Sequence, residues 1–218
     1  MNRPIRSFVL RQGRTTPAQG RALEQLYPKY GIAFSDQKVA SARNAPLVIE
    51  IGSGMGETTV EIAKGHPETD FIAIEVHGPG VGSLLNRIES QGLKNLRVIR
   101  HDALEVLERM VGDGTLAALH LFFPDPWPKK RHHKRRLVQP AFASLVARKL
   151  RGGGIVHAAT DWPDYAEQIA AVFSADSSFA GSESGFASRP ATKFETRGRR
   201  LGNPVRDLVF VRRQEAAP

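Results

Sequence analysis

One acidic residue, Asp125, is held between two prolines in the segment Pro-Asp-Pro-Trp at residues 124–127, at the end of a hydrophobic stretch. Proline fixes its own backbone angle φ and restricts the residue before it, so this loop should hold the carboxylate in place before any reaction begins. Pro128 follows, and the eight residues after it, 129–136, contain six lysines or arginines and two histidines. A rigid carboxylate and an indole beside a polycationic segment indicate chemistry on a nucleic acid. The alternative is a rigid surface turn next to an ordinary solvated face.

The chain has no cysteine. Disulfides, thiolate zinc sites and iron–sulfur clusters are therefore excluded, and so is an enzyme that attacks a pyrimidine ring through a cysteine thiolate. By residue type, His132 and His133 are candidate metal ligands. Adjacent side chains point in different directions, however, and the sequence offers no third ligand beside them. We therefore expect no metal.

A glycine-rich turn, Gly-Ser-Gly-Met-Gly at residues 52–56, directly follows an apolar run and precedes a helical pattern. Such a turn lets the backbone approach a ligand at the N-terminus of a helix. It is not a Walker A phosphate loop, because no lysine follows Gly56. Gly52 and Gly54 are candidate cofactor-binding residues, although a purely structural turn between a strand and a helix also uses glycine. Glu75 follows Gly56 by 19 residues, a spacing that suits an acid bound to the ribose of a dinucleotide or of S-adenosylmethionine.

The wider pattern of acidic residues separates these two cofactors. In a parallel sheet the carboxyl ends of all the strands lie at the same edge, and ligands bind there. An acidic edge would repel the pyrophosphate of a dinucleotide, whereas S-adenosylmethionine carries a sulfonium and an ammonium group and no phosphate. The carboxylates at or just after the ends of predicted strands are Glu50, Glu75, Asp102, Asp125 and Asp161. Two of these five residues, Asp102 and Asp161, have an alternative role as helix N-caps.

The elements that must position these residues alternate along the chain. Apolar residues at helical spacing begin near residues 81, 104, 142 and 165, and the glycines at 152–154 should end the third of these helices and open the next strand. Residues 174–190 predict a loop or a weak strand. The pattern indicates an α/β protein with a doubly wound, Rossmann-like, mostly parallel sheet. Its strands are expected at residues 47–51, 71–75, 96–99, 116–123, 155–159 and, near the C-terminus, 207–211.

Residues 1–46 differ from the rest: they are rich in arginine and have poor apolar periodicity, which predicts a basic, partly flexible arm before a single domain at 47–218. The whole chain of 218 residues carries a net charge of +9, which favours a polyanionic partner, either a nucleic acid or an anionic membrane. The longest apolar stretch is far too short to span a bilayer, and no secretory signal is recognisable. We expect a cytoplasmic protein without a membrane partner.

These residues resemble the bacterial tRNA (guanine-N7)-methyltransferases over nearly the whole chain. The resemblance rests on residues 50–56, 74–82 and 123–136, completed by residues 160–161 and 192–195. The second and third segments are highly specific, while many methyltransferases share the first. The arm around residues 11–20 is similar too. One small departure is Gly78, where the family pattern has serine. The resemblance implies a class I methyltransferase fold with an antiparallel C-terminal strand, and methylation of N7 of guanine 46 in the tRNA variable loop.

The resemblance also implies a role for each site residue. Asp125 would be the catalytic or guanine-positioning residue and would also lie near the cofactor. S-adenosylmethionine would be bound by Glu50, Gly52, Gly54, Glu75, on the ribose, and Asp102, near the adenine edge. The substrate would be contacted by Lys129, Asp161, Thr192, Lys193, Phe194 and Glu195. The tRNA backbone would lie on Arg131, His132, His133, Lys134, Arg135 and Arg136.

Other functions compete with this one. The Pro-Asp-Pro-Trp loop resembles the Asp-Pro-Pro-Tyr loop of exocyclic-amine methyltransferases, so an enzyme of that class is the main rival. A non-catalytic RNA-binding protein with a Rossmann-like core is another, and a dehydrogenase is disfavoured by the acidic edge. The sequence leaves open whether the protein is a monomer or a homodimer.

Overall fold

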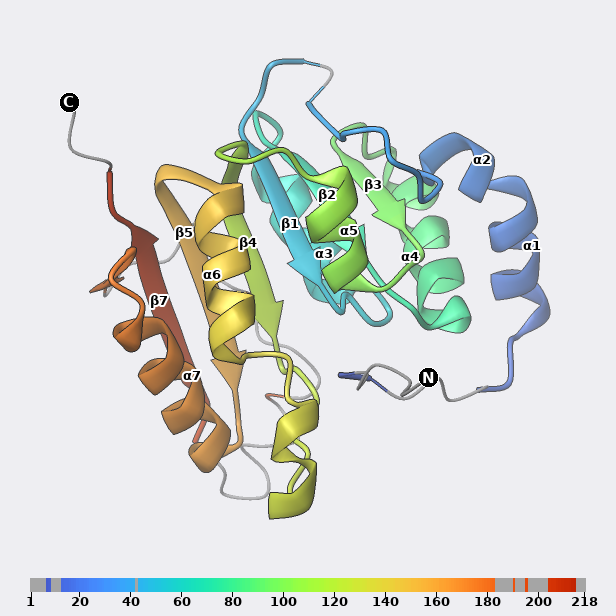
Figure 1. The fold of residues 1–218 in the computed structure, drawn as a ribbon. Helices are drawn as coiled ribbons and strands as arrows, with labels where there is room; N and C mark the ends of the chain where they lie inside the picture. The colour runs from blue at the N-terminus through green and yellow to red at the C-terminus, as the bar shows by residue number, and fades with distance from the viewer. Residues whose placement is uncertain are drawn as a thin grey trace.

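A seven-stranded sheet forms the centre of the computed structural model, which describes residues 7–8, 13–41, 43–182, 190, 195 and 204–214. The spatial order is β3-β2-β1-β4-β5-β7-β6 (Figure 1). Strands β1 to β5 are parallel, and β7 and β6 are antiparallel additions at one edge. This confirms the predicted fold class. The strands are β1 Leu47–Ile51, β2 Asp70–Ile74, β3 Leu96–Ile99, β4 Leu116–Phe122, β5 Leu150–Thr160, β6 Phe179–Ser182 and β7 Arg206–Arg212.

Helices cover both faces of the sheet, so the buried apolar side chains form two clusters, one on each face. Helices α5 (Ala103–Met110), α6 (Pro140–Lys149) and α7 (Pro163–Ala175) pack on one face, and α3 (Glu57–Gly65) and α4 (Gly78–Gln91) on the other (Figure 1). Every residue of β1 and of β4 is buried. Their sequences, apolar except for Glu50 and His120, are typical of parallel strands that are covered on both sides.

The segment predicted as a flexible arm contains two helices, α1 (Pro17–Gln25) and α2 (Tyr27–Tyr30). Thr16 and Gln19 form a capping box at the start of α1: the hydroxyl of Thr16 accepts from the backbone N–H of Gln19, and the amide oxygen of Gln19 accepts from the backbone N–H of Thr16. Helix α1 then packs on α4, where a Cβ added to Gly82 would stand 2.5 Å from the Gln19 carbonyl oxygen. The described part of this segment is thus folded against the domain.

Two elements have bounds in the structure that differ from the predicted ones. Strand β5 begins at Leu150, directly after α6 ends at Lys149, so the three glycines lie inside the strand segment and do not end the helix. They accommodate an irregularity, because the pairing of β4 with β5 shifts register next to them and Gly153 has φ of 77°. The expected weak strand within 174–190 is β6, which is only four residues long. In the part of the chain that the structure describes, no helix is long and apolar enough to cross a membrane.

Candidate active site at the carboxyl edge of the sheet

The order of the strands creates a natural ligand site between β1 and β4. From β1 the chain proceeds through α3 to β2 on one side, and from β4 it proceeds through α6 to β5 on the other, with the two helices on opposite faces. Ligands of open α/β sheets bind beyond the carboxyl ends of the strands at such a switch point. The two segments that begin there are the glycine turn at residues 52–56 and the proline-rich loop at residues 123–129.

The five predicted carboxylates all lie at this edge. Glu50 is the second-last residue of β1, and Glu75 and Asp161 directly follow β2 and β5. Asp102 and Asp125 each lie three residues beyond the end of their strand. Because the strands are neighbours in the order β3-β2-β1-β4-β5, the carboxylates follow one another across the edge as Asp102, Glu75, Glu50, Asp125 and Asp161.

The glycine turn is open on the side where a ligand would lie. Gly52 and Gly54 have φ of 77° and 56°, in the left-handed region that favours glycine, and a Cβ added at either would meet nothing within 4 Å. Gly56 also has a positive φ, of 78°, but a Cβ there would stand 2.4 Å from Leu84 Cδ1. The first two glycines therefore leave space beside the backbone, and the third allows α3 to pack against α4.

Glu75 is buried and holds the glycine turn in place. One carboxylate oxygen accepts from the backbone N–H of Gly54 at 2.8 Å, and the other accepts from the backbone N–H of His77, also at 2.8 Å. A carboxylate oxygen has two lone pairs, so each oxygen can accept one further hydrogen bond from a ligand hydroxyl. The geometry is compatible with the predicted ribose contact and adds a second role that sequence spacing did not reveal.

Glu50 is almost fully buried, and burial raises its pKa to about 7, with the negative charge of Glu75 acting in the same direction. The cofactor-free protein therefore favours the protonated form of this side chain below neutral pH. A carboxylate with this environment would be stabilised by a cationic ligand, because the positive charge offsets the lost hydration.

Replacing Glu50 by glutamine should change how stability depends on pH. Because the pKa of Glu50 is raised to about 7 in the folded state, wild-type stability has a contribution that falls as pH rises from the unfolded pKa of about 4.5 through 7. Glu50→Gln mimics the protonated form, so it should exceed wild type at pH 8 by up to about 3 kcal/mol and match it near pH 4.5. Urea unfolding at the two pH values measures this difference. An equal difference at both values would contradict the burial effect.

Asp102 caps helix α5, as its alternative role predicted. One carboxylate oxygen accepts from the backbone N–H of Leu104 at 2.9 Å, which leaves the second oxygen for other contacts. The neighbouring His101 ring stacks on Phe34 with 3.6 Å between ring centroids. Phe34 comes from the N-terminal segment, which pairs with the domain at Gly31 and Val39. This aromatic pair beside Asp102 was not predicted, because nothing in the sequence brings residue 34 to residue 101.

The loop that carries Asp125 is constrained beyond its prolines. Phe123 and Trp127 have φ of 51° and 45°, a left-handed backbone conformation that is strained for residues other than glycine. The Trp127 indole N–H donates to the backbone carbonyl of Ser7 at 3.0 Å. Asp125 itself is exposed and lies three residues beyond the carboxyl end of β4.

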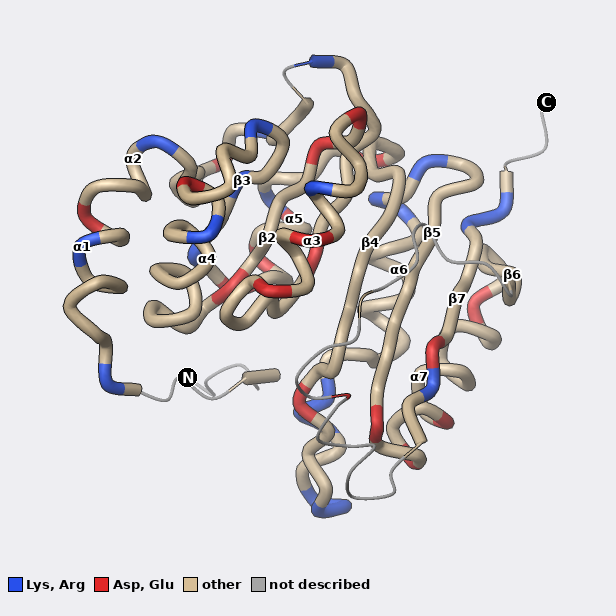
Figure 2. The backbone as a smooth tube through the Cα atoms, turned by 180° about the vertical axis from the view of Figure 1, so that it is seen from behind, with Lys and Arg blue, Asp and Glu red and all other residues tan. Residues whose placement is uncertain are grey.

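The cationic segment forms a single 3-10 helix, η1 (Lys130–Arg135), which projects beyond the carboxyl edge of the sheet (Figures 1 and 2). Side chains three residues apart lie above one another in such a helix, so it has three faces. His132 and Arg135 lie on the Trp127 ring, at 5.9 Å between ring centroids and at 4.9 Å from the guanidinium carbon to the ring centroid. Arg131 and Lys134 make up the exposed face.

The third face of this segment turns toward helix α7 and changes the interpretation of Arg136. His133 lies 3.6 Å from the Asp164 carboxylate, and Arg136 pairs with the same carboxylate at 2.8 Å. The Arg136 side chain is only 2% exposed. A buried guanidinium that is bonded within the protein has no free face for a phosphate, so we leave Arg136 out of the proposed RNA surface.

Comparison with known proteins finds relatives over nearly the whole chain. A family model described as "Putative methyltransferase" matches residues 44–208. A tRNA (guanine-N(7)-)-methyltransferase of Nitrosomonas eutropha is 54% identical over 217 residues, covering 96% of this chain and 97% of the relative. The enzyme of the same name from Neisseria meningitidis serogroup A is 52% identical over 220 residues, covering 96% and 92%. The chain belongs to the tRNA (guanine-N7)-methyltransferase family.

Solved structures with little sequence identity share the fold. The aminoglycoside resistance methyltransferase NpmB1 superimposes with a TM-score of 0.54 at 15% identity, covering 77% of this chain and 87% of its own. An rRNA methylase from Streptococcus thermophilus gives a TM-score of 0.52 at 13% identity, covering 78% and 88%. These likenesses support the class I methyltransferase fold of this family member.

The remaining predicted site residues of this methyltransferase-family chain are only partly described. Lys129 is exposed and directly precedes η1, and Asp161 is half-buried at the start of the β5–α7 connection. Glu195 is buried. Thr192, Lys193 and Phe194 lie outside the described residues. Among the residues that are described, no three histidine or acidic side chains come together in a way that could hold a metal ion.

Proposed function

We propose that the protein transfers a methyl group from S-adenosylmethionine to N7 of guanine 46 in the variable loop of tRNA. The observation that carries the proposal is the position of Asp125: an exposed carboxylate on a constrained loop, between a cofactor-type glycine turn on β1 and a cationic helix after β4. Family membership supports the reaction type. We also propose a cytoplasmic location, where a tRNA substrate would be met.

The residues at the edge fit S-adenosylmethionine. Gly52 and Gly54 leave open space beside the turn, and Glu75 keeps spare lone pairs for ribose hydroxyls. The buried Glu50 carboxylate, whose pKa is raised to about 7, would be stabilised by a cation. Asp102 has one carboxylate oxygen left over from capping α5, which could accept from the adenine amine. When bound, S-adenosylmethionine supplies an electrophilic methyl group on a positively charged sulfur.

The chemistry at N7 asks little of the protein beyond placement. N7 of a neutral guanine has a lone pair and no proton, so no general base is needed. Asp125 would accept hydrogen bonds from the N–H groups of guanine and orient N7 toward the methyl group. Its negative charge would also offset the positive charge that develops on the purine. Lys129, Asp161 and the segment 192–195 would complete the substrate contacts.

The exposed face of η1 should bind the tRNA backbone, which predicts a specific change in salt dependence. Neutralising Arg131 and Lys134 together, as Arg131→Gln with Lys134→Gln, removes two phosphate contacts. The slope of log affinity against log salt should then become shallower by about 1.5. Filter binding of tRNA across a salt series measures the slope.

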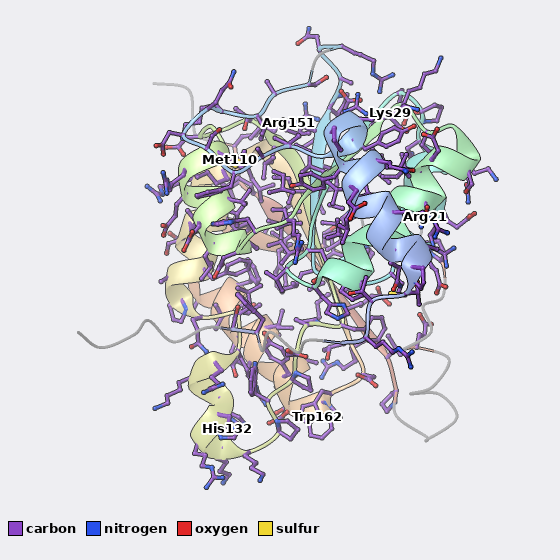
Figure 3. The ribbon with its side chains drawn as sticks, turned by 90° about the vertical axis from the view of Figure 1, so that its right-hand side faces the viewer. Arg21, Lys29, Met110, His132, Arg151 and Trp162 are labelled. Atoms are coloured by element: carbon purple, nitrogen blue, oxygen red, sulfur yellow. The ribbon has the colours of Figure 1, made fainter. Side chains whose placement is uncertain are left out.

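A matched pair of charges controls for overall electrostatics. Arg148, in the last turn of α6, and Arg151, at the start of β5, are both exposed and lie near the amino end of that strand. Figure 3 shows Arg151 at the other end of the molecule from His132 and Trp162. Arg148→Gln with Arg151→Gln removes the same total charge and should leave the slope within error of wild type. Equal changes in the two double variants would show that η1 is an ordinary solvated face.

Analysis of the methylated nucleoside tests the proposed function. Unmodified tRNA is incubated with the protein and isotopically labelled S-adenosylmethionine, then digested to nucleosides, which are analysed by liquid chromatography and mass spectrometry. Because 7-methylguanosine and N2-methylguanosine have the same mass, the nucleosides are resolved by liquid chromatography before the mass is measured. The proposal expects label in 7-methylguanosine, together with strand scission at position 46 after reduction and aniline treatment. Label in N2-methylguanosine or N6-methyladenosine would instead identify an exocyclic-amine methyltransferase. Binding of tRNA without any label transfer would favour a non-catalytic RNA-binding protein.

A further inference from the structure

We propose that Arg136 is a positioning residue, whose buried guanidinium fixes the loop at residues 124–127, and with it the Asp125 carboxylate, against helix α7. The predicted effect on catalysis rests on the proposed methyl transfer. The predicted effect on the order of the loop does not, and it is measured separately.

All three nitrogens of the Arg136 side chain are used within the protein. Nε donates to the backbone carbonyl of Pro126 at 2.8 Å, and Nη1 donates to Gln168 Oε1 at 2.8 Å. Nη2 donates to both carboxylate oxygens of Asp164, at 3.0 and 2.8 Å. The guanidinium carbon also lies 4.8 Å from the centroid of the Tyr165 ring. The side chain thus joins the Asp125 loop to α7 through one rigid planar group.

Helix α7 holds the other side of this connection along a single stretch of its surface. Asp164, Tyr165 and Gln168 lie within its first two turns. Besides their contacts with Arg136, the Tyr165 hydroxyl accepts from the backbone N–H of Val138 at 3.2 Å, and Gln168 Nε2 donates to the Val138 carbonyl at 2.8 Å. The chain just after η1 therefore packs on α7. The hydrogen bond from Arg136 to the Pro126 carbonyl joins the two ends of the segment that contains η1.

The loop needs an external tether because its own conformation is strained. Trp127 has φ of 45°, a left-handed conformation that is unfavourable for a residue other than glycine. Pro126 stands between Trp127 and Asp125, so a bond to the Pro126 carbonyl restrains both neighbours. The Trp127 indole is bonded to Ser7 and covered by Arg135, but neither contact reaches the backbone of the loop.

A lysine cannot reproduce this arrangement, which provides the decisive variant. The guanidinium presents donors in a fixed fork, whereas an ammonium is a compact point charge on a flexible stem. Arg136→Lys keeps the positive charge, and a phosphate-binding residue would tolerate it. A positioning residue would not, because the ammonium cannot reach Pro126, Gln168 and Asp164 together.

Steady-state methylation of tRNA separates the two roles. For Arg136→Lys we expect kcat to fall about tenfold or more and KM for tRNA to stay unchanged. The reason is that a small misplacement of a catalytic group lowers the rate of the chemical step strongly. Arg148→Lys, the same exchange at an exposed site in the last turn of α6, should keep wild-type kcat and KM. Wild-type kcat in Arg136→Lys, or a loss confined to KM for tRNA, would overturn the proposal.

The fluorescence of Trp127 reports the order of the loop without any reaction. The chain has two tryptophans, so Trp162→Phe leaves Trp127 as the only one. In that background, Arg136→Lys should raise the acrylamide quenching constant, because the loop is released. An unchanged constant would contradict the tether. If the parent protein bound tRNA but transferred no methyl group, the proposed function would fail, and this measurement would still decide the tether.

A second, milder variant covers the case in which Arg136→Lys does not fold. Asp164 is about half exposed, so Asp164→Asn should fold normally while weakening the paired hydrogen bonds to Arg136. It should lower kcat severalfold and raise Trp127 quenching, with the same dependence of tRNA affinity on salt as wild type. Wild-type values of both kcat and quenching would overturn the proposal.

Discussion

Asp125→Asn should lower kcat for tRNA methylation by roughly 10²–10³-fold, the size of effect seen when one group that stabilises developing charge is removed. Asparagine keeps the shape of the side chain and one acceptor oxygen, but it lacks the negative charge that we propose offsets the positive charge on the purine. Asp125 is exposed, so the midpoint of thermal unfolding should not change. Affinity for tRNA should stay constant or rise slightly, because a negative charge beside the cationic helix has been removed.

Single-turnover methylation under saturating cofactor and tRNA measures the effect on the chemical step. Glu108→Gln, which removes one exposed carboxylate from helix α5, serves as the control and should keep the wild-type rate. An Asp125→Asn enzyme that methylates as fast as wild type would show that Asp125 neither holds the guanine nor offsets its charge.

Gly56→Ala should destabilise the fold by about 2–4 kcal/mol, which combines left-handed backbone strain with overpacking of the core. Gly56 has φ of 78°, and an added Cβ would stand 2.4 Å from Leu84 Cδ1 and 2.8 Å from Leu84 Cβ. The second contact is with an atom fixed to the backbone of α4, so a rotamer change cannot relieve it. Helix α3 would have to move away from α4.

Gly92→Ala isolates the contribution of the clash. Gly92, at the end of α4, also has a positive φ, of 63°, but a Cβ there would meet nothing within 4 Å. This variant should cost only the backbone strain, about 1–2 kcal/mol. Urea unfolding of both variants gives the comparison, and equal losses of stability would contradict close packing of Gly56 on Leu84.

The central sheet was predictable because its signal is local. Strands β1 and β3 have the bounds that their apolar runs indicated, and the carboxylates follow the strand ends in the predicted manner. The N-terminal helices were missed for a different reason. Poor apolar periodicity concealed α1, although Thr16-Pro17-Ala18-Gln19 carries a capping-box pattern with proline at the first helical position.

What the sequence could not predict depends on partners distant in the chain. The sequence does not distinguish the six lysines and arginines at residues 129–136 from one another. In the structure, however, the three faces of this segment contact solvent, Trp127 and α7. Arg136 differs from Arg131 because its guanidinium binds Gln168 and Asp164, which lie 32 and 28 residues further on, and the Pro126 carbonyl. Glu75 likewise bonds Gly54 across 21 residues. Such pairings follow from the packing of whole elements, which no local pattern encodes.

The central claim is that the methyl group goes to N7 of guanine 46, and one substitution in the substrate tests it most directly. A tRNA carrying 7-deazaguanine at position 46 has carbon in place of N7 but keeps the exocyclic amine and the other edges of the base. With labelled S-adenosylmethionine, we predict full methylation of the guanine-containing tRNA and none of the 7-deaza tRNA, at equal affinity of the protein for both. Methylation of the 7-deaza tRNA at the normal rate would contradict the account.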